Sequence, residues 1–85
     1  MQAQKPGKAA TIYEQMLKAS PNDARLWNNF GAALNLSAQP TQAITALENA
    51  VRLDPSMKQA WTNLGNLYQA QGDQAKADAA FAKGK

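Results

Sequence analysis

Six carboxylates are the side chains of this chain best suited to chemistry: Glu14, Asp23, Glu48, Asp54, Asp73 and Asp78. Paired carboxylates can act as general acid and base, but no two of these follow the spacing of a catalytic motif. The sequence also has no phosphate-binding glycine loop, no Gly-x-Ser-x-Gly turn and no calcium-loop pattern. Histidine and cysteine are absent, which excludes imidazole catalysis, disulfides and Cys/His zinc sites. We therefore expect no enzyme activity, no metal and no cofactor.

The positive charge of the chain lies at its two ends. The formal net charge is +3 over 85 residues, and Lys5, Lys8, Lys83 and Lys85 account for it. The other five basic and six acidic residues leave the middle of the chain with a net charge of −1. A nucleic-acid-binding protein would carry a basic stripe on its folded part, so nucleic acid is the weakest partner hypothesis. No apolar run reaches the length of a membrane span, and residues 1–8 lack the apolar core of a signal peptide, so we expect a soluble chain of unknown compartment.

The sequence repeats itself with a period of 34 residues, and a fixed period of this length is typical of solenoids. Residues recur at six positions: Trp27 as Trp61, Asn29 as Asn63, Gly31 as Gly65, Pro21 as Pro55, Pro6 as Pro40, and Ala9 as Ala43 and Ala77. Two tryptophans, two glycines and two proline pairs at one offset are hard to attribute to chance. The period therefore predicts one repeated structural unit.

Each period predicts two helices. Apolar residues at helical spacing follow Asn22 and Ser56, which we interpret as N-caps, and predict helices over 24–37 and 58–71. We name these the A-type helices. The B-type helices are predicted over about 40–53, opened by Pro40, and about 74–83, after a cap at Asp73. By the same phase Pro6 opens an earlier B-type helix over 7–19, which gives the order B-A-B-A-B.

The residues at the repeated positions also carry a family resemblance. Trp27, Phe30, Gly31, Leu34, Ala43, Leu47, Ala50 and Pro55 resemble the tetratricopeptide repeat pattern, as do Trp61, Leu64, Gly65, Tyr68, Gly72, Ala77 and Phe81 in the next unit. The resemblance implies an all-α fold, a right-handed α-solenoid of antiparallel helical hairpins. It divides the single domain 1–85 into a half repeat (6–23), a full repeat (24–57) and a C-terminally truncated repeat (58–85). Ala38, Met16 and Gly84 depart from the pattern, and we expect looser packing or capping there.

The glycines and aromatic residues have physical roles that do not depend on the resemblance. Gly31 and Gly65 have no side chain, so the B-type partner helix can approach closely. The large aromatic residues at helical spacing then fill the space that remains, and we interpret them as core wedges.

The resemblance further implies a noncatalytic protein–protein interaction scaffold whose concave face, made by the A-type helices, binds a peptide or protein segment. Carried over position by position, the polar residues of this face are Arg25, Asn28, Asn29, Asn35, Gln59, Thr62, Asn63, Asn66 and Gln69, with Ala32, Leu36 and Ala70 between them. Asn29 and Asn63 share one repeat position, so stacking is expected to bring them side by side, each able to bond a peptide backbone. Only Arg25 is basic, so a clamp for a terminal carboxylate is not expected. A solvated, nonfunctional asparagine face is the competing interpretation.

Self-assembly is the alternative function. The chain begins with a B-type helix and ends on another, where we expect Ala77, Ala80 and Phe81 to face outward without a polar cover. Such ends favour a homo-oligomer formed by head-to-tail stacking or by helix exchange through the terminal helices. A fragment cut from a longer array, with neighbours that once covered both ends, fits the same pattern. The identity of any protein partner is not indicated.

Overall fold

The computed structural model describes the backbone of residues 6–85 and the side chains of residues 8–85. Five α-helices make up this part of the chain, and no strand occurs in it. Their bounds are α1 Pro6–Ala19, α2 Ala24–Leu36, α3 Pro40–Leu53, α4 Lys58–Ala70 and α5 Gln74–Lys83. Lys5, which we assigned to the basic tail, lies outside the described residues.

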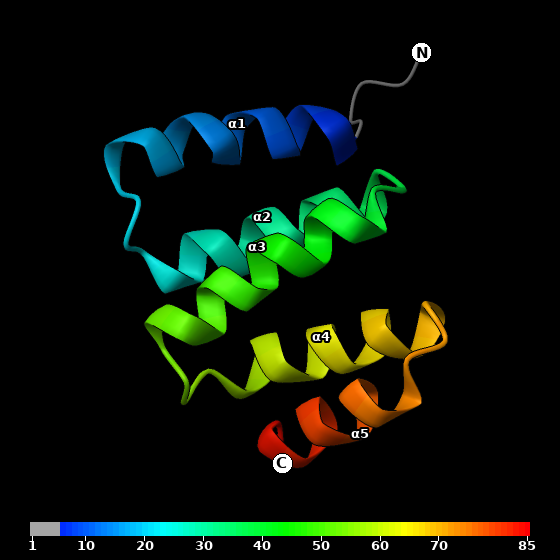
Figure 1. Ribbon diagram of the computed structural model, residues 1–85. Coiled ribbons are helices and arrows are strands. Elements are labelled where there is room, and N and C mark those ends of the chain that lie inside the picture. Colours follow the sequence, from blue (N-terminus) through cyan, green and yellow to red (C-terminus); the bar gives the residue numbers. More distant parts are fainter. Residues whose placement is uncertain (1–5) are drawn as a thin grey trace.

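The helices form a stack in chain order (Figure 1). Each helix packs mainly on its neighbours in sequence, α2 on α3 and α4 on α5 within hairpins, and α1 on α2 and α3 on α4 between them. The stack measures 38 × 28 × 17 Å. The predicted all-α solenoid in the order B-A-B-A-B is therefore confirmed.

The capping residues differ by one position from two of our predictions. Asp23, not Asn22, caps α2, and its Oδ1 accepts hydrogen bonds from the backbone N–H groups of Arg25 and Leu26. Met57, not Ser56, precedes α4, because Ser56 instead donates its hydroxyl to Asp54 in the turn. The two helices begin at Ala24 and Lys58 as predicted, and only the capping residue is shifted by one position. Asp73 caps α5 as expected and accepts from the N–H of Lys76.

The A-type helices end one residue earlier than predicted, in matching C-terminal turns. Ala38 and Gly72 occupy one repeat position and have φ values of +61° and +85°. The N–H of the next residue donates to the carbonyl five residues earlier, Gln39 to Leu34 at 2.9 Å and Asp73 to Tyr68 at 2.9 Å. An alanine therefore holds a left-handed conformation that favours glycine, which gives a physical meaning to this departure from the repeat pattern.

Close helix approach at the two repeated glycines is confirmed. A Cβ atom on Gly31 would lie 2.7 Å from Leu47 Cγ, and one on Gly65 would lie 2.6 Å from the Phe81 ring. Ala43, Ala50 and Leu47 are at most 1% exposed in the same contact layer. In each hairpin a glycine of the A-type helix thus receives a large side chain of the partner helix, Leu47 at Gly31 and Phe81 at Gly65.

Each tryptophan also holds the loop that precedes its helix against that helix. The indole N–H of Trp27 donates to the Pro21 carbonyl at 2.7 Å, and that of Trp61 donates to the Pro55 carbonyl at 2.8 Å. The tryptophan and proline pairs that recur at one offset in the sequence are therefore partners in one contact.

One expectation about the chain ends is wrong. Ala77 and Ala80 are 0% and 2% exposed, and Phe81 packs on Gly65 rather than facing outward. The apolar face of α5 is used by its own hairpin partner α4, and its other face carries exposed alanines and charged side chains. At the other end of the stack, Ile12 and Met16 on α1 are 54% and 45% exposed.

Candidate functional site

The two A-type helices supply all nine predicted site residues. Seven of these side chains are exposed, namely Arg25, Asn29, Asn35, Gln59, Thr62, Asn66 and Gln69. Asn63 is half-buried, and Asn28 is only 6% exposed. We call this set of nine residues the amide wall.

Part of the amide wall surrounds a groove between α2 and α4. The groove has a volume of about 240 Å³, and its polar lining is Asn35, Asn63 and Asn66. Its apolar lining is Gly31, Ala32, Leu36, Leu47 and Leu67. Leu36 is 72% exposed, so a large apolar side chain is presented to solvent next to the asparagines. An apolar recess with a few placed polar groups is the usual chemistry of a ligand-binding site.

The other members of the wall do not line this groove. Arg25 lies near the start of α2, beside a different hollow. Thr62 lies against the end of α5, since a Cβ on Gly84 would come within 2.6 Å of its Oγ1. The structure therefore brings three of the nine predicted residues together around one hollow.

Asn63 has a second role, which sequence spacing did not indicate. Its Nδ2 donates to Asn28 Oδ1 at 3.2 Å, a bond between side chains 35 residues apart. We expected Asn29, at the same repeat position as Asn63, to lie beside it. Asn29 instead is exposed, whereas Asn28 is buried where α2 meets α4. Asn28 thus joins successive repeats and is not free for a ligand.

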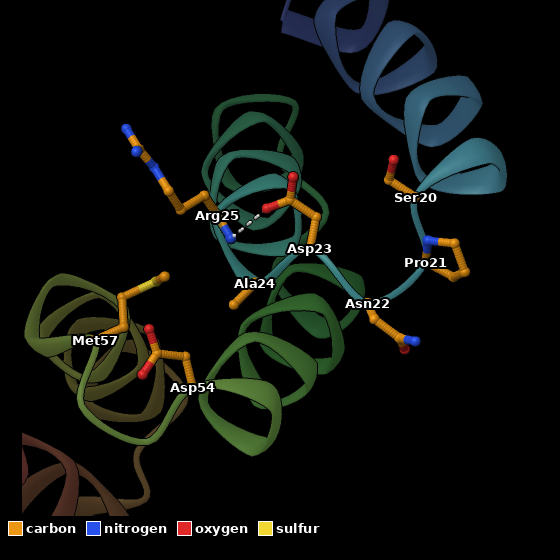
Figure 2. Close-up of a pocket in the computed structure, with 8 residues that line it drawn as sticks. All are labelled: Ser20, Pro21, Asn22, Asp23, Ala24, Arg25, Asp54 and Met57. Carbon is orange, nitrogen blue, oxygen red and sulfur yellow. Dashed lines mark hydrogen bonds between the residues drawn. The ribbon is translucent and has the colours of Figure 1, made fainter.

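A larger hollow lies elsewhere, at the edge of the stack where two loops meet (Figure 2). It measures about 650 Å³ and is lined by residues of the α1–α2 loop and the start of α2, together with Asp54 and Met57. The carboxylates here already serve the backbone: Asp23 caps α2, and Asp54 accepts from the N–H and hydroxyl of Ser56. We interpret this hollow as the space between two capping turns.

A polar cluster joins α3, α4 and α5 on another side of the stack. The hydroxyl of Tyr68 donates to Glu48 Oε2 at 2.6 Å, and the Lys76 ammonium lies 5.7 Å from the centre of the Tyr68 ring. Burial, together with the Glu48 carboxylate that accepts from it, raises the pKa of Tyr68 above its ordinary value of 10.0. Sequence reasoning missed this cluster, although Glu14 and Glu48 recur at the offset of 34.

Two further findings concern the described residues alone. No group of three or more acidic side chains in residues 6–85 is arranged to hold a metal ion. None of the five helices combines the length and apolarity needed to cross a bilayer.

Comparison with known proteins gives a family match for the central part of the chain. Residues 39–72, which span α3 and α4, match a family model described as "TPR repeat". A search of curated protein sequences gives no match. Among solved structures 45 chains match.

One of these structures is described as "MamA MSR-1 C2" and superposes with a TM-score of 0.85 at 20% sequence identity. The match covers 93% of this chain and 45% of that one, so this chain spans less than half the length of that structure. At this identity the likeness concerns the fold.

Proposed function

Because this chain carries a tetratricopeptide repeat at residues 39–72 within a solenoid of that fold, we propose that it is a noncatalytic scaffold for protein–protein interaction. Its ligand is an extended peptide or protein segment, bound in the groove between α2 and α4 that Asn35, Asn63 and Asn66 of the amide wall line. The domain is the half repeat, the full repeat and the truncated repeat of residues 1–85 acting together.

The groove between α2 and α4 is the observation that carries this proposal. An extended segment exposes backbone N–H and C=O groups along its length, and an asparagine amide can donate to one and accept from the other. Asn35 and Asn66 are exposed at the groove and have no hydrogen-bond partner among the described side chains. Their amides are therefore available to a ligand backbone.

The apolar lining adds a preference for one side chain of the ligand. A volume of about 240 Å³ bounded by Leu36, Leu47 and Leu67 accepts a side chain of leucine or methionine size. Burying such a side chain contributes about 1.5–3 kcal/mol, more than the 0.5–1.5 kcal/mol of one amide hydrogen bond. We infer modest affinity, with one apolar anchor and little dependence on the flanking sequence.

A ligand with a terminal carboxylate is not favoured. The groove lining holds no basic side chain, and Arg25 lies at the start of α2 beside another hollow. The amides bind a neutral peptide backbone without leaving a charge unpaired.

Peptide arrays probed with the intact chain test this proposal. We expect binding to uncharged extended peptides that carry one leucine or methionine, and a loss of about tenfold in the variant Asn35→Ala/Asn66→Ala. The matched control is Asn29→Ala/Gln59→Ala, which removes two exposed amides from the same helices outside the groove. Equal losses in both variants would contradict binding in the groove.

Self-association is the second candidate function, and the exposed Ile12 and Met16 of α1 favour it. The C-terminal end contributes less than expected, because Ala77, Ala80 and Phe81 are covered by α4. We infer that any homo-oligomer uses α1. Mass measured in solution over a range of concentrations tests this inference, and a strict monomer at high concentration would exclude it.

A further inference from the structure

Another hollow lies over α2 between α1 and α3, away from the amide wall. It measures about 320 Å³, and the aromatic side chains of Trp27 and Phe30 line it. Their ring centroids are 6.0 Å apart, and both side chains are half-buried. Glu14, Gln42 and Thr45 supply its polar lining.

The repeat provides an internal comparison for this hollow. In the next repeat, 34 residues further along, the equivalent residues are Glu48 for Glu14, Tyr68 for Leu34 and Lys76 for Gln42. In that second unit the Glu48 carboxylate accepts from the Tyr68 hydroxyl at 2.6 Å. The Lys76 ammonium lies 5.7 Å from the Tyr68 ring centre. There an acid, an aromatic ring and a cation, all from this chain, are grouped together.

The first unit keeps the acid but lacks the ring of Tyr68 and the cation, and its aromatic lining comes from Trp27 and Phe30 instead. Leu34 has no hydroxyl, and Gln42 has no charge. Within residues 8–85, Glu14 makes no hydrogen bond and no ion pair. The hollow therefore combines an unpaired carboxylate with two aromatic faces, and the cation present in the next unit is missing.

We propose that this hollow binds a lysine or arginine side chain of a partner protein. The aliphatic stem of that side chain lies along Trp27 and Phe30, and its cation pairs with the Glu14 carboxylate. Aromatic faces attract cations, which adds to the charge pairing. The occupant takes the place that Lys76 holds in the second unit. This site is separate from the groove between α2 and α4, so either proposal can be contradicted while the other holds.

Nuclear magnetic resonance of the isotope-labelled chain tests the proposal with two short peptides. One is acetyl-Gly-Lys-Gly-amide, and the other has norleucine in place of lysine, which keeps the stem and removes the charge. We expect the lysine peptide to shift the indole N–H of Trp27 and the amide of Gln42, with the Trp61 indole unchanged. Binding of the norleucine peptide is expected to be about three- to tenfold weaker.

Three variants locate the effect. Glu14→Gln is expected to reduce binding of the lysine peptide to the norleucine level, whereas Glu48→Gln, the same change in the occupied unit, leaves it unaltered. Gln42→Lys supplies an internal cation at the position of Lys76 and is expected to block the peptide. The proposal is overturned if the two peptides bind equally, if Glu14→Gln binds like the unchanged chain, or if no resonance at the hollow moves up to about 20 mM peptide.

Discussion

The side-chain amide of Asn63 donates a hydrogen bond to the side-chain oxygen of Asn28, 3.2 Å away, and so joins α4 to α2. This bond separates the amide wall into two kinds of residue. Asn28 and Asn63 hold successive repeats together, whereas Asn35 and Asn66 have free amides at the groove. A substitution at Asn63 therefore tests stability as well as binding, and Asn35 and Asn66 are the better positions for testing binding.

Asn63→Ala is expected to destabilise the fold. The buried Asn28 loses its partner, and an unsatisfied buried polar group costs about 1–3 kcal/mol. For a domain of this size each kcal/mol lowers the melting temperature by about 4–8 °C. Thermal unfolding followed by circular dichroism measures this. Asn66→Ala, on the same helix but exposed, is the control and should change stability by less than about 0.5 kcal/mol. Equal melting temperatures for the two variants would contradict a structural role for the bond.

Ala38→Gly is expected to stabilise the chain by about 1 kcal/mol. Ala38 has φ of +61°, where glycine avoids the steric cost of a Cβ atom. Gly72→Ala is the reverse change at the same repeat position and should destabilise by a similar amount. Nothing lies within 4 Å of a Cβ on Gly72, so this effect would come from the backbone alone. Denaturant unfolding of both variants checks the pair, and changes of the same sign would refute the explanation.

Gly31→Leu is expected to disrupt the first hairpin. Even a Cβ there would lie 2.7 Å from Leu47 Cγ, so a full side chain forces α2 and α3 apart. Overpacking of this kind costs at least about 1–3 kcal/mol. Ala32→Leu adds the same side chain to the next, exposed position of α2 and should leave the free energy of unfolding nearly unchanged. If both variants melt alike, close approach at Gly31 is not important for stability.

Stability is expected to fall at high pH through Tyr68. Its pKa is raised in the folded chain, first by burial and then by Glu48, so folding favours the neutral phenol. That contribution is complete below the ordinary pKa of 10.0 and is lost as the pH rises above it. Raising the pH from about 8 to about 11 should therefore lower the melting temperature of the unchanged chain more than that of Tyr68→Phe. Equal losses would show that the Tyr68 proton does not contribute, because the two chains differ only by the Tyr68 hydroxyl.

The period of 34 residues predicted the helices because it constrains the whole hairpin. Trp27, Gly31 and Pro21 each have one role per repeat, and those roles recur at Trp61, Gly65 and Pro55. Phase placed the starts of the two helices but not their capping residues, because the hydrogen bonds within the turn decide which residue caps. Asp23 and Met57 are consequently the N-cap residues, in place of the predicted Asn22 and Ser56.

The candidate site was harder to predict than the fold. The sequence identified which helices form the wall, but helix crossing decides which asparagines meet, so Asn63 contacts Asn28 while Asn29 faces solvent. The Glu48–Tyr68 contact was missed because it joins different helices across an offset of 20 residues. The one sequence feature that pointed to Glu48 is the glutamate at the same repeat position, Glu14.

The most direct test of the central claim is a titration of the isotope-labelled chain with an uncharged extended peptide that carries one leucine, followed by the side-chain amide resonances. Binding in the groove predicts shifts of Asn35 and Asn66, with an affinity near the millimolar range, and no shift of Asn29 or Gln69. At the same peptide concentration, the remaining side-chain amide resonances of the variant Asn35→Ala/Asn66→Ala should not shift. Shifts confined to residues outside the groove, or none at saturating peptide, would contradict the proposal that α2 and α4 form a peptide-binding face.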